Sequence, residues 1–394
     1  MGLFHTADPD DIKSGKITDV YFDRTMQVLK AKGIKKRVRA EFIAKSLPDG
    51  WEWAILAGIE EAACLLEGLP INVRAMAEGT VCYPYQPVLE IEGEYTDFGL
   101  YETAVLGLLC QASGVATKSA RFRKLAGERA VISFGARRMH PVLAPMIERN
   151  AYVGGCDGVS VIKSAELIEA EAMGTMPHAL ILLFGDTVEA TRAYDEVISK
   201  KVKRTSLIDT FNDEKFETVR VAEALGPSLY GVRLDTPGSR RGDFYRILEE
   251  VRWELDLRGF NYVKLFVSGG IKEADVPKLN PVVDAYGIGT GISNAPVVDF
   301  SMDIVEVEGA PFAKRGKWSG AKSVLRCSEC GRDAGSIVPL TDKAAPCPLC
   351  GGQRREILLD FIEKGNIIGE LPKPAKLREK VIRSLEKLPA LVLS

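Results

Sequence analysis

The stretch Val131-Ile132-Ser133-Phe134-Gly135-Ala136-Arg137-Arg138 passes from a short apolar run of β type into glycine and then into two arginines. The same change, from an apolar run to glycine with charged or hydroxyl residues, recurs as far as about residue 292. The other runs are Tyr152–Gly155, Ala179–Phe184, Ser206–Ile208, Leu229–Leu234, Val263–Val267 and Val282–Gly287. Polar segments of helical period separate most of them. This pattern indicates a βα repeat, whose functional side chains lie at the carboxyl ends of the strands.

The repeat predicts the α/β fold class. We expect an α/β barrel, complete or incomplete, with a flanking layered α+β domain and a small cysteine-bearing segment near the C-terminus. The expected domains are residues 1–112 (N-terminal α+β), 113–298 (barrel) and 299–394 (C-terminal segment). A chain of 394 residues is long enough for two or three domains.

Outside the repeat, periodicity predicts several further elements. Helices are expected over Trp51–Leu69, over Tyr101–Ala126 with an interruption near Ser113-Gly114, and over Pro374–Leu388. Strands are expected over Val73–Ala77, Pro87–Gly93 and Val297–Val307.

Composition excludes some classes of protein. Lysine and arginine (52) nearly balance aspartate and glutamate (54), so bulk electrostatic binding of nucleic acid is not expected. No apolar stretch approaches the roughly 20 residues that a membrane span needs, and the N-terminus does not resemble a signal peptide. Four isolated cysteines in apolar or glycine-rich surroundings suit a reducing compartment, so we expect a cytoplasmic protein. They are Cys64, Cys82, Cys110 and Cys156.

Two C-x-x-C-G motifs stand near the C-terminus, within residues 326–353. They contribute Cys327, Cys330, Cys347 and Cys350, at a spacing typical of four-cysteine zinc sites. Four thiolates fill a tetrahedral zinc ion completely and leave no open position for catalysis. The motifs therefore predict a structural zinc ion. A pair of disulfides is the alternative, and it does not suit a reducing compartment.

The polar residues after the runs suggest an anionic substrate. Arg137 and Arg138 follow a predicted strand, where arginine can clamp phosphate or carboxylate groups. A salt bridge between domains is the structural alternative for either arginine. His178, one of three histidines, stands in a turn bounded by glycine and proline before a predicted strand, and we expect it to be catalytic.

Taken in order, a set of motifs across nearly the whole chain resembles nicotinate phosphoribosyltransferases, most closely the archaeal-type members with a zinc-knuckle tail. The motifs are Thr18–Tyr21, Glu102-Thr103, Ser113–Thr117, Phe134–Arg138, Gly158–Ser160, Gly174–His178, Asp209-Thr210, Val232–Asp235 and Gly289–Gly291. The resemblance implies that nicotinate and phosphoribosyl pyrophosphate are converted to nicotinate mononucleotide and pyrophosphate, in NAD salvage.

The resemblance also implies roles for aromatic and basic residues. Tyr21 and Phe134 would sandwich the pyridine ring, with Tyr21 reaching across from a second protomer of a homo-oligomer. Arg137 and Arg233 would hold carboxylate and phosphate groups, and Arg138 is a further candidate beside them.

Acidic, hydroxyl and glycine residues complete the implied site. Asp209 and Asp235 would contact ribose hydroxyls or water bound to the Mg²⁺ that accompanies phosphoribosyl pyrophosphate. Glycine-rich loops would cradle the 5′-phosphate with backbone N–H groups. The other expected substrate-binding residues are Thr210, Gly269, Gly270, Gly289, Thr290 and Gly291.

His178 matches the histidine that this family phosphorylates from ATP, so the resemblance implies ATP as a co-substrate. The match departs from the family in one detail, because a hydroxyl residue often follows that histidine and Ala179 does here.

Three alternatives remain open. Nicotinamide phosphoribosyltransferase has an aspartate where Ser160 stands, which would repel a carboxylate, whereas serine donates a hydrogen bond to one. Asp157 lies three residues away, so a shifted alignment would revive that substrate. Quinolinate phosphoribosyltransferase ranks third, because its chain is shorter and its dicarboxylate needs more cations. The last alternative is a non-catalytic zinc-ribbon protein that senses nucleotides.

Overall fold

The computed structural model describes residues 4–236, 238–240, 242–331, 336–342 and 345–393. The chain forms two compact units. Unit 1 comprises Met1–Thr117 and Pro296–Pro389, and unit 2 comprises Lys118–Ala295 and Ala390–Ser394. The boundary falls within the long helix α5 (Glu102–Ala126), and the chain enters unit 1 twice.

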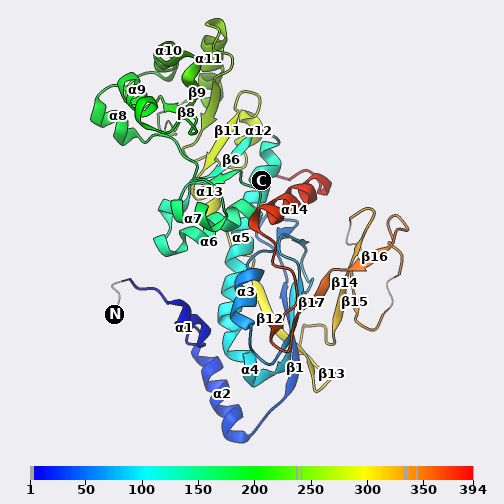
Figure 1. Ribbon diagram of the computed structural model, residues 1–394. Helices are drawn as coiled ribbons and strands as arrows, with labels where there is room; N and C mark the ends of the chain where they lie inside the picture. The colour runs from blue at the N-terminus through cyan, green and yellow to red at the C-terminus, as the bar shows by residue number, and fades with distance from the viewer. Residues whose placement is uncertain (1–3, 237, 241, 332–335, 343–344, 394) are drawn as a thin grey trace. The chain divides into compact units, whose positions relative to one another are not determined.

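Unit 2 contains an open sheet of parallel strands, of which β6, β8, β9 and β11 are labelled in Figure 1. Its order is β7 (Gly158–Val159), β6 (Ala130–Ser133), β11 (Ala285–Ile288), β10 (Lys264–Val267), β9 (Leu229–Leu234) and β8 (Arg204–Leu207). Among the described residues β7 and β8 pair with one neighbour each, so the curled sheet is a half-barrel. The predicted fold class, with an incomplete barrel, is confirmed.

Helices between these strands complete unit 2. They are α6 (Ala144–Val153), α7 (Ile162–Leu167), α8 (His178–Phe184), α9 (Thr187–Val197), α10 (Glu214–Leu225), α11 (Phe244–Leu257), α12 (Val276–Leu279) and α13 (Thr290–Ser293). Aspartate side chains cap three of them. Asp186 accepts from the N–H groups of Val188 and Glu189, Asp213 caps α10 in the same way, and Asp243 accepts from the N–H of Arg246 at the start of α11.

Two predicted strands of the repeat are wrong. Tyr152 and Val153 end helix α6, and the run from Ala179 to Phe184 lies in helix α8. A short apolar run has no periodicity that separates a buried strand from a helix, and tertiary contacts decided both cases. The remaining runs coincide with β6, β8, β9, β10 and β11.

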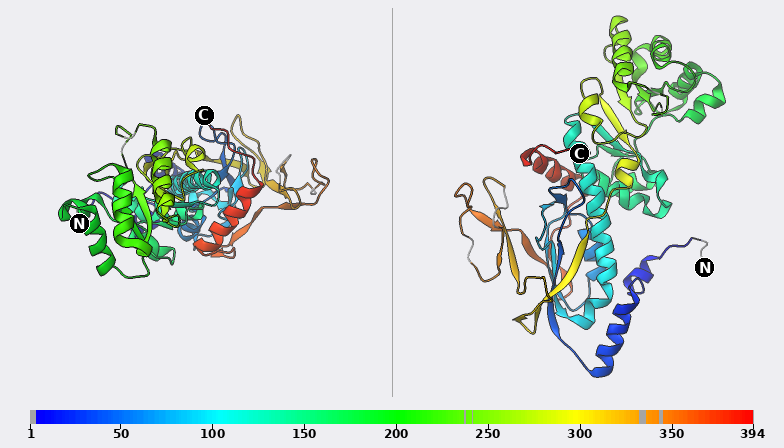
Figure 2. Two further views of the ribbon diagram at one scale, coloured as in Figure 1. Left: turned by 90° about the horizontal axis from the view of Figure 1, so that it is seen from above. Right: turned by 180° about the vertical axis from the view of Figure 1, so that it is seen from behind.

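Unit 1 is built on a seven-stranded antiparallel sheet. Its order is β13 (Ala310–Pro311), β12 (Phe300–Val307), β1 (Arg37–Ala44), β5 (Leu89–Glu94), β3 (Asn72–Met76), β17 (Leu358–Glu363) and β18 (Asn366–Ile367). Helix α3 (Ile59–Leu66) and the first turns of α5 cover one face, as Figures 1 and 2 show, and form the core with the sheet. Strands β12 and β17, which follow the half-barrel in the sequence, pair in this sheet with strands from the first part of the chain.

The rest of unit 1 consists of short elements. They are α1 (Pro9–Lys13), α2 (Val20–Lys32), the pair β2 (Ala54–Ile55) and β4 (Val81–Cys82), α4 (Tyr95–Phe98), and helix α14 (Pro374–Lys387). A small sheet of order β15 (Ile337–Pro339), β14 (Lys322–Cys327) and β16 (Arg354–Glu356) carries the cysteine segment.

The structure corrects two predicted helices of unit 1. The expected helix over Trp51–Leu69 begins only at Ile59, because Ala54 and Ile55 pair with β4 instead. The expected interruption at Ser113-Gly114 is absent from α5. Gly114 instead allows the backbone at Pro296 to pack against α5, since a Cβ atom at this position would lie 2.3 Å from the Pro296 carbonyl oxygen.

Candidate active site

The carboxyl ends of the unit 2 strands bring several predicted site residues together. Phe134 directly follows β6, and Asp209 lies just beyond β8. Arg233 is the next-to-last residue of β9, and Asp235 directly follows that strand. Because parallel strands end at the same edge, these side chains share one rim of the half-barrel.

His178 reaches this rim from α8, as the first residue of that helix rather than from a turn before a strand. Its Nδ1 atom lies 3.0 Å from the Thr210 hydroxyl, and its Nε2 atom lies 3.7 Å from Asp235 Oδ2. The imidazole is 41% exposed, so a substrate can still reach it. The structure thus joins three residues that are widely separated in the sequence.

Asp209 and Asp235 form a connected carboxylate pair. Asp209 Oδ2 accepts a hydrogen bond of 2.9 Å from the Asp235 backbone N–H, and Asp235 Oδ1 accepts one of 2.5 Å from the Ser268 hydroxyl. Burial raises the pKa of Asp209, and the nearby His178 opposes that rise. Asp209 Oδ1 is buried without a hydrogen-bond partner among the described residues. Such an oxygen indicates a place where a ligand completes the site.

Arg233 lies at the centre of the rim. Its Nη1 donates to the Thr175 hydroxyl, and its Nη2 lies 3.5 Å from Asp235 Oδ2. Its guanidinium carbon lies 5.9 Å from the centroid of the Phe134 ring, within range of a cation–π contact. Burial lowers the pKa of Arg233, and its Nε has no partner among the described residues.

Sequence reasoning missed two contributors, Thr175 and Ser268. Thr175 holds Arg233, and Ser268 holds Asp235. Thr175 stands within the motif Gly174–His178, and Ser268 directly precedes the predicted phosphate-binding residue Gly269, so their position was the available signal. Their hydroxyl contacts appear only in three dimensions.

Arg137 and Arg138 lie in the 3₁₀ turn Ala136–Arg138, immediately after Phe134. Both are exposed, and neither forms an ion pair with another described residue. Arg137 is close enough to Arg233 to lower the pKa of that guanidinium further. The arrangement concentrates positive charge beside the carboxylate pair.

The glycines differ in what the backbone requires of them. Gly269 has φ +84°, and a Cβ atom there would lie 2.1 Å from the Asp235 carbonyl oxygen, so only glycine fits. Gly270 also has a left-handed φ of +78°. Gly289 and Thr290 begin the short helix α13, while Gly291 packs against the ring of Phe122.

Ser160 follows β7, the strand beside β6, and its hydroxyl is already engaged. The hydroxyl donates a hydrogen bond of 2.7 Å to Glu148 Oε1, which also accepts from the Ser160 backbone N–H at 3.1 Å. Glu148 is fully buried in helix α6. Asp157, the alternative position for substrate discrimination, instead pairs with Arg123 at 2.6 Å.

Tyr21 belongs to unit 1, on helix α2, and this residue is 57% exposed. Its nearest aromatic neighbour is Phe22, with 4.3 Å between ring centroids.

Four of the cysteines of unit 1 converge: Cys327, Cys330, Cys347 and Cys350. Their sulfur atoms all lie within 4.8 Å of one another, with 3.5 Å between Cys327 and Cys350 and 3.7 Å between Cys330 and Cys347. A disulfide requires about 2.05 Å, whereas tetrahedral thiolates at about 2.3 Å from zinc lie roughly 3.8 Å apart. Gly331 and Gly351 have left-handed φ values and close the two turns, as the motif predicts. Residues 332–335 and 343–344 of this segment lie outside the described residues.

Comparisons with known proteins agree with this fold. Residues 19–113 match the family model "Quinolinate phosphoribosyl transferase, N-terminal domain", and residues 115–303 match the corresponding C-terminal domain model. The crystal structure of nicotinate-nucleotide pyrophosphorylase from Pyrococcus furiosus is 53% identical, with a TM-score of 0.96 over 98% of this chain and 99% of that one.

Two further relatives are named as nicotinate phosphoribosyltransferases. Nicotinate phosphoribosyltransferase pncB1 of Mycobacterium tuberculosis is 28% identical, over 96% of this chain and 92% of its own length. Human nicotinic acid phosphoribosyltransferase, at 19% identity over 94% of each chain, shares the fold with a TM-score of 0.75. The half-barrel and its rim define an enzyme of the quinolinate phosphoribosyltransferase type. The chain belongs to the quinolinate phosphoribosyl transferase family. Within this class it is similar to proteins named nicotinate phosphoribosyltransferase. No helix in the described part of the chain is long and apolar enough to cross a membrane.

Proposed function

We propose that this enzyme converts nicotinate and phosphoribosyl pyrophosphate to nicotinate mononucleotide and pyrophosphate, in NAD salvage. The observation that carries the proposal is the rim where Arg233 lies between the Phe134 ring and the Asp235 carboxylate. An aromatic face, a buried cation and two carboxylates suit a flat anionic ring that joins a ribose. The names of the relatives support the same reaction.

Phe134 and Arg233 are proposed to hold the nicotinate. The ring of Phe134 offers a stacking surface, and Arg233, whose Nε is unpaired, offers charged donors to the carboxylate. Tyr21 is proposed to cover the other side of the pyridine ring from a second protomer of a homo-oligomer, which its exposure on α2 would permit.

Asp209 and Asp235 are proposed to bind ribose hydroxyls and the Mg²⁺ that accompanies phosphoribosyl pyrophosphate. Carboxylate oxygens are the ligands that Mg²⁺ prefers, and Asp209 Oδ1 has no other described partner, so the donor set fits this ion. When bound, Mg²⁺ neutralises charge on the departing pyrophosphate. Arg137 and Arg138 would add positive charge to the same anion.

The backbone at Gly269, Gly270, Gly289, Thr290 and Gly291 is proposed to bind the 5′-phosphate of the substrate. Gly269 and Gly270 follow β10 and Gly289 follows β11, and these strands are neighbours in the sheet. Their backbone therefore lies in two adjacent loops at the same edge of the sheet, where backbone N–H groups can form an anion-binding concavity.

His178 is proposed to accept a phosphoryl group from ATP, which would couple hydrolysis to product formation. In this step the attacking ring nitrogen forms a bond to the γ-phosphorus while the bond to the ADP oxygen breaks. Thr210 orients the ring through Nδ1, and Asp235 lies beside Nε2 and would stabilise positive charge on the imidazole. The four cysteines are proposed to hold one structural zinc ion, which their sulfur separations fit.

Nicotinamide is the second candidate substrate, because the serine that was expected to recognise a carboxylate is already engaged. The Ser160 hydroxyl donates to Glu148, so its hydrogen is not available to a nicotinate carboxylate. We therefore assign carboxylate recognition to Arg233 and regard Ser160 as a positioning residue of the loop after β7.

Pyrophosphate release tests the proposal directly. Purified protein is given phosphoribosyl pyrophosphate and Mg²⁺ with nicotinate, nicotinamide or quinolinate, each with and without ATP. We expect turnover on nicotinate, raised by ATP. Turnover on nicotinamide instead would transfer substrate recognition to the Ser160 loop, and no turnover on any ring would favour a nucleotide-sensing role.

A further inference from the structure

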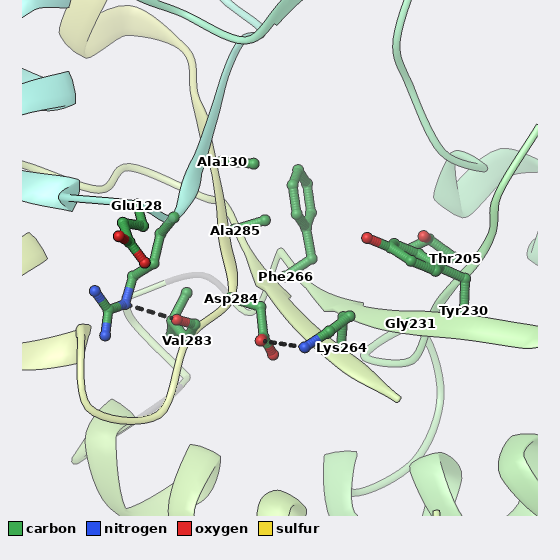
Figure 3. Close-up of a pocket in the computed structure, with 11 residues that line it drawn as sticks. Glu128, Ala130, Thr205, Tyr230, Gly231, Lys264, Phe266, Val283, Asp284 and Ala285 are labelled. Atoms are coloured by element: carbon green, nitrogen blue, oxygen red, sulfur yellow. Dashed lines mark hydrogen bonds and ion pairs between the residues drawn. The ribbon is translucent and has the colours of Figure 1, made fainter. Parts of the chain in front are cut away.

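A cavity of about 470 Å³ opens at the end of the unit 2 sheet opposite to the candidate active site (Figure 3). Ala130, Lys264 and Ala285, which line it, are the first residues of β6, β10 and β11. Thr205 and Gly231 line it from the beginnings of β8 and β9. We call this space the rear cavity. None of the residues assigned above to catalysis or substrate binding lines it.

Small side chains explain why this end of the half-barrel is not filled. In closed α/β barrels, layers of branched residues such as valine, isoleucine and leucine fill the interior. Here Ala130 pairs with Ala285, and Thr205 pairs with Gly231. Gly231 cannot be enlarged, since a Cβ atom there would lie 2.8 Å from the Lys264 carbonyl oxygen. The sequence thus leaves room for a ligand where a barrel usually packs its own side chains.

Two aromatic rings supply the walls. Figure 3 shows the rings of Phe266 and Tyr230 facing the same space, with Ala130 and Ala285 beside Phe266. Phe266 is 7% exposed and ends the cavity on its inner side. The ammonium of Lys203 lies 4.3 Å from the centroid of the Tyr230 ring and 3.2 Å from its hydroxyl, which holds that ring in place. Walls of this kind suit a flat ring.

The rim carries balanced charge, unlike the arginine-rich catalytic end. Lys264 pairs with Asp284 at 3.0 Å. Arg129 donates through Nε to the carbonyl oxygens of Asn280 and Val283, and Glu128 contributes an exposed carboxylate. The residues that line the cavity thus include two cations and two carboxylates. An anion such as phosphate gains little there, whereas a neutral ligand with both donors and acceptors finds partners of both kinds.

We propose that the rear cavity is a second ligand site, which binds an uncharged planar heteroaromatic molecule of the nucleobase class. Its ring lies between Tyr230 and Phe266, and its donor and acceptor edge meets the Lys264–Asp284 pair. The same Phe266 ring meets Phe134 at the catalytic end, with 5.9 Å between centroids and a 60° interplanar angle. Occupancy of the rear cavity is therefore transmitted to Phe134.

Adenine is the probe, and its binding to the full-length protein is measured by calorimetry. Ala285→Leu fills the cavity, and Tyr230→Ala removes one wall. Ala193→Leu, the same alanine replacement on the outer helix α9, is the matched control. We expect adenine to bind the wild type and Ala193→Leu equally, and at least tenfold more weakly to the other two variants. Circular dichroism checks that each variant is folded.

Further measurements distinguish adenine binding at the rear cavity from binding at the catalytic end. Asp235→Asn should leave adenine binding unchanged, and neither phosphate nor nicotinate should displace adenine. In protein labelled with ¹³C-phenylalanine, adenine should shift the Phe134 resonance in the wild type and not in Ala285→Leu. Undiminished affinity in both folded cavity variants, displacement by phosphate, or no adenine binding to the wild type would each overturn the proposal. None of these measurements requires turnover, so the result is independent of the proposed reaction.

Discussion

The hydroxyl of Ser160 donates a 2.7 Å hydrogen bond to the fully buried carboxylate of Glu148, which also accepts from the backbone N–H of Val161 at 2.9 Å. A buried carboxylate is stable only when its oxygens are well paired, and here the loop after β7 supplies three donors. The contact therefore ties the loop to helix α6. The sequence alone predicts that the same hydroxyl donates to the nicotinate carboxylate.

This contact predicts that substitution of Ser160 affects the stability of the protein more than its activity. Ser160→Ala should change kcat/KM for nicotinate by less than about threefold, while lowering stability by about 1–3 kcal/mol because Glu148 loses a donor. Ser160→Asp should not create a nicotinamide enzyme, since the new carboxylate would face Glu148 and repel it. Steady-state kinetics with both rings, together with urea unfolding, measure the two effects. A tenfold rise in KM for nicotinate in Ser160→Ala would restore the direct role of the hydroxyl.

His178 should govern the response to ATP. We expect His178→Ala to retain binding of nicotinate and to lose ATP stimulation of turnover, because the ring between Thr210 and Asp235 is the proposed phosphoryl acceptor. His140→Ala is the control, because this second exposed histidine of unit 2 bonds only locally, to the N–H of Val142. Pyrophosphate release with and without ATP decides the matter, and an ATP response that persists in His178→Ala would contradict the assignment.

Arg233 should not tolerate replacement by lysine. A lysine has one cationic centre and cannot contact Thr175, Asp235 and the Phe134 ring together. Loss of a buried charged hydrogen bond costs about 1.5–3 kcal/mol, so kcat/KM should fall by roughly ten- to a hundredfold or more. Arg138→Lys, at an exposed position of the same charge, should cost far less. Equal losses in the two variants would argue against a central role for Arg233.

The cysteine cluster predicts about one zinc ion per chain by elemental analysis. Chelation, or Cys347→Ser, should speed hydrogen exchange within residues 326–353, because the ion holds a segment with little core of its own. Cys64→Ser, which replaces an exposed cysteine outside the cluster, should leave the zinc content and the exchange unchanged. Protein that contains no metal would refute the zinc assignment.

Glu102 should make stability depend on pH. Burial, reinforced by Asp303, raises the pKa of Glu102 to about 7 from 4.5. The folded state thus holds this proton more tightly than the unfolded state does, so the contribution to stability is full below about pH 4.5 and is lost as pH rises through 7. Relative to the wild type, Glu102→Gln should therefore gain in urea midpoint between pH 5 and pH 8. A constant difference would show that Glu102 titrates normally.

The βα repeat, the cysteine motif and most rim residues could be predicted from the sequence, because they depend on residues that are close together in the chain. A strand followed by glycine and charge predicts a carboxyl-end loop wherever it occurs, and Phe134, Asp209 and Asp235 all stand in such loops. Each C-x-x-C-G turn brings its own two thiolates together by local geometry alone. These features needed no knowledge of distant contacts.

Tertiary structure decided the features that depend on partners far away in the chain. Residues 179–184 became helix rather than strand, and Gly114 allowed the backbone at Pro296 to approach α5 instead of breaking it. The engagement of Ser160 by Glu148 and of Arg233 by Thr175, and the rear cavity between Phe266 and Tyr230, likewise could not be inferred from spacing. The physical reason is that sequence periodicity reports which residues are buried, whereas hydrogen bonds and cavities depend on which buried residues meet.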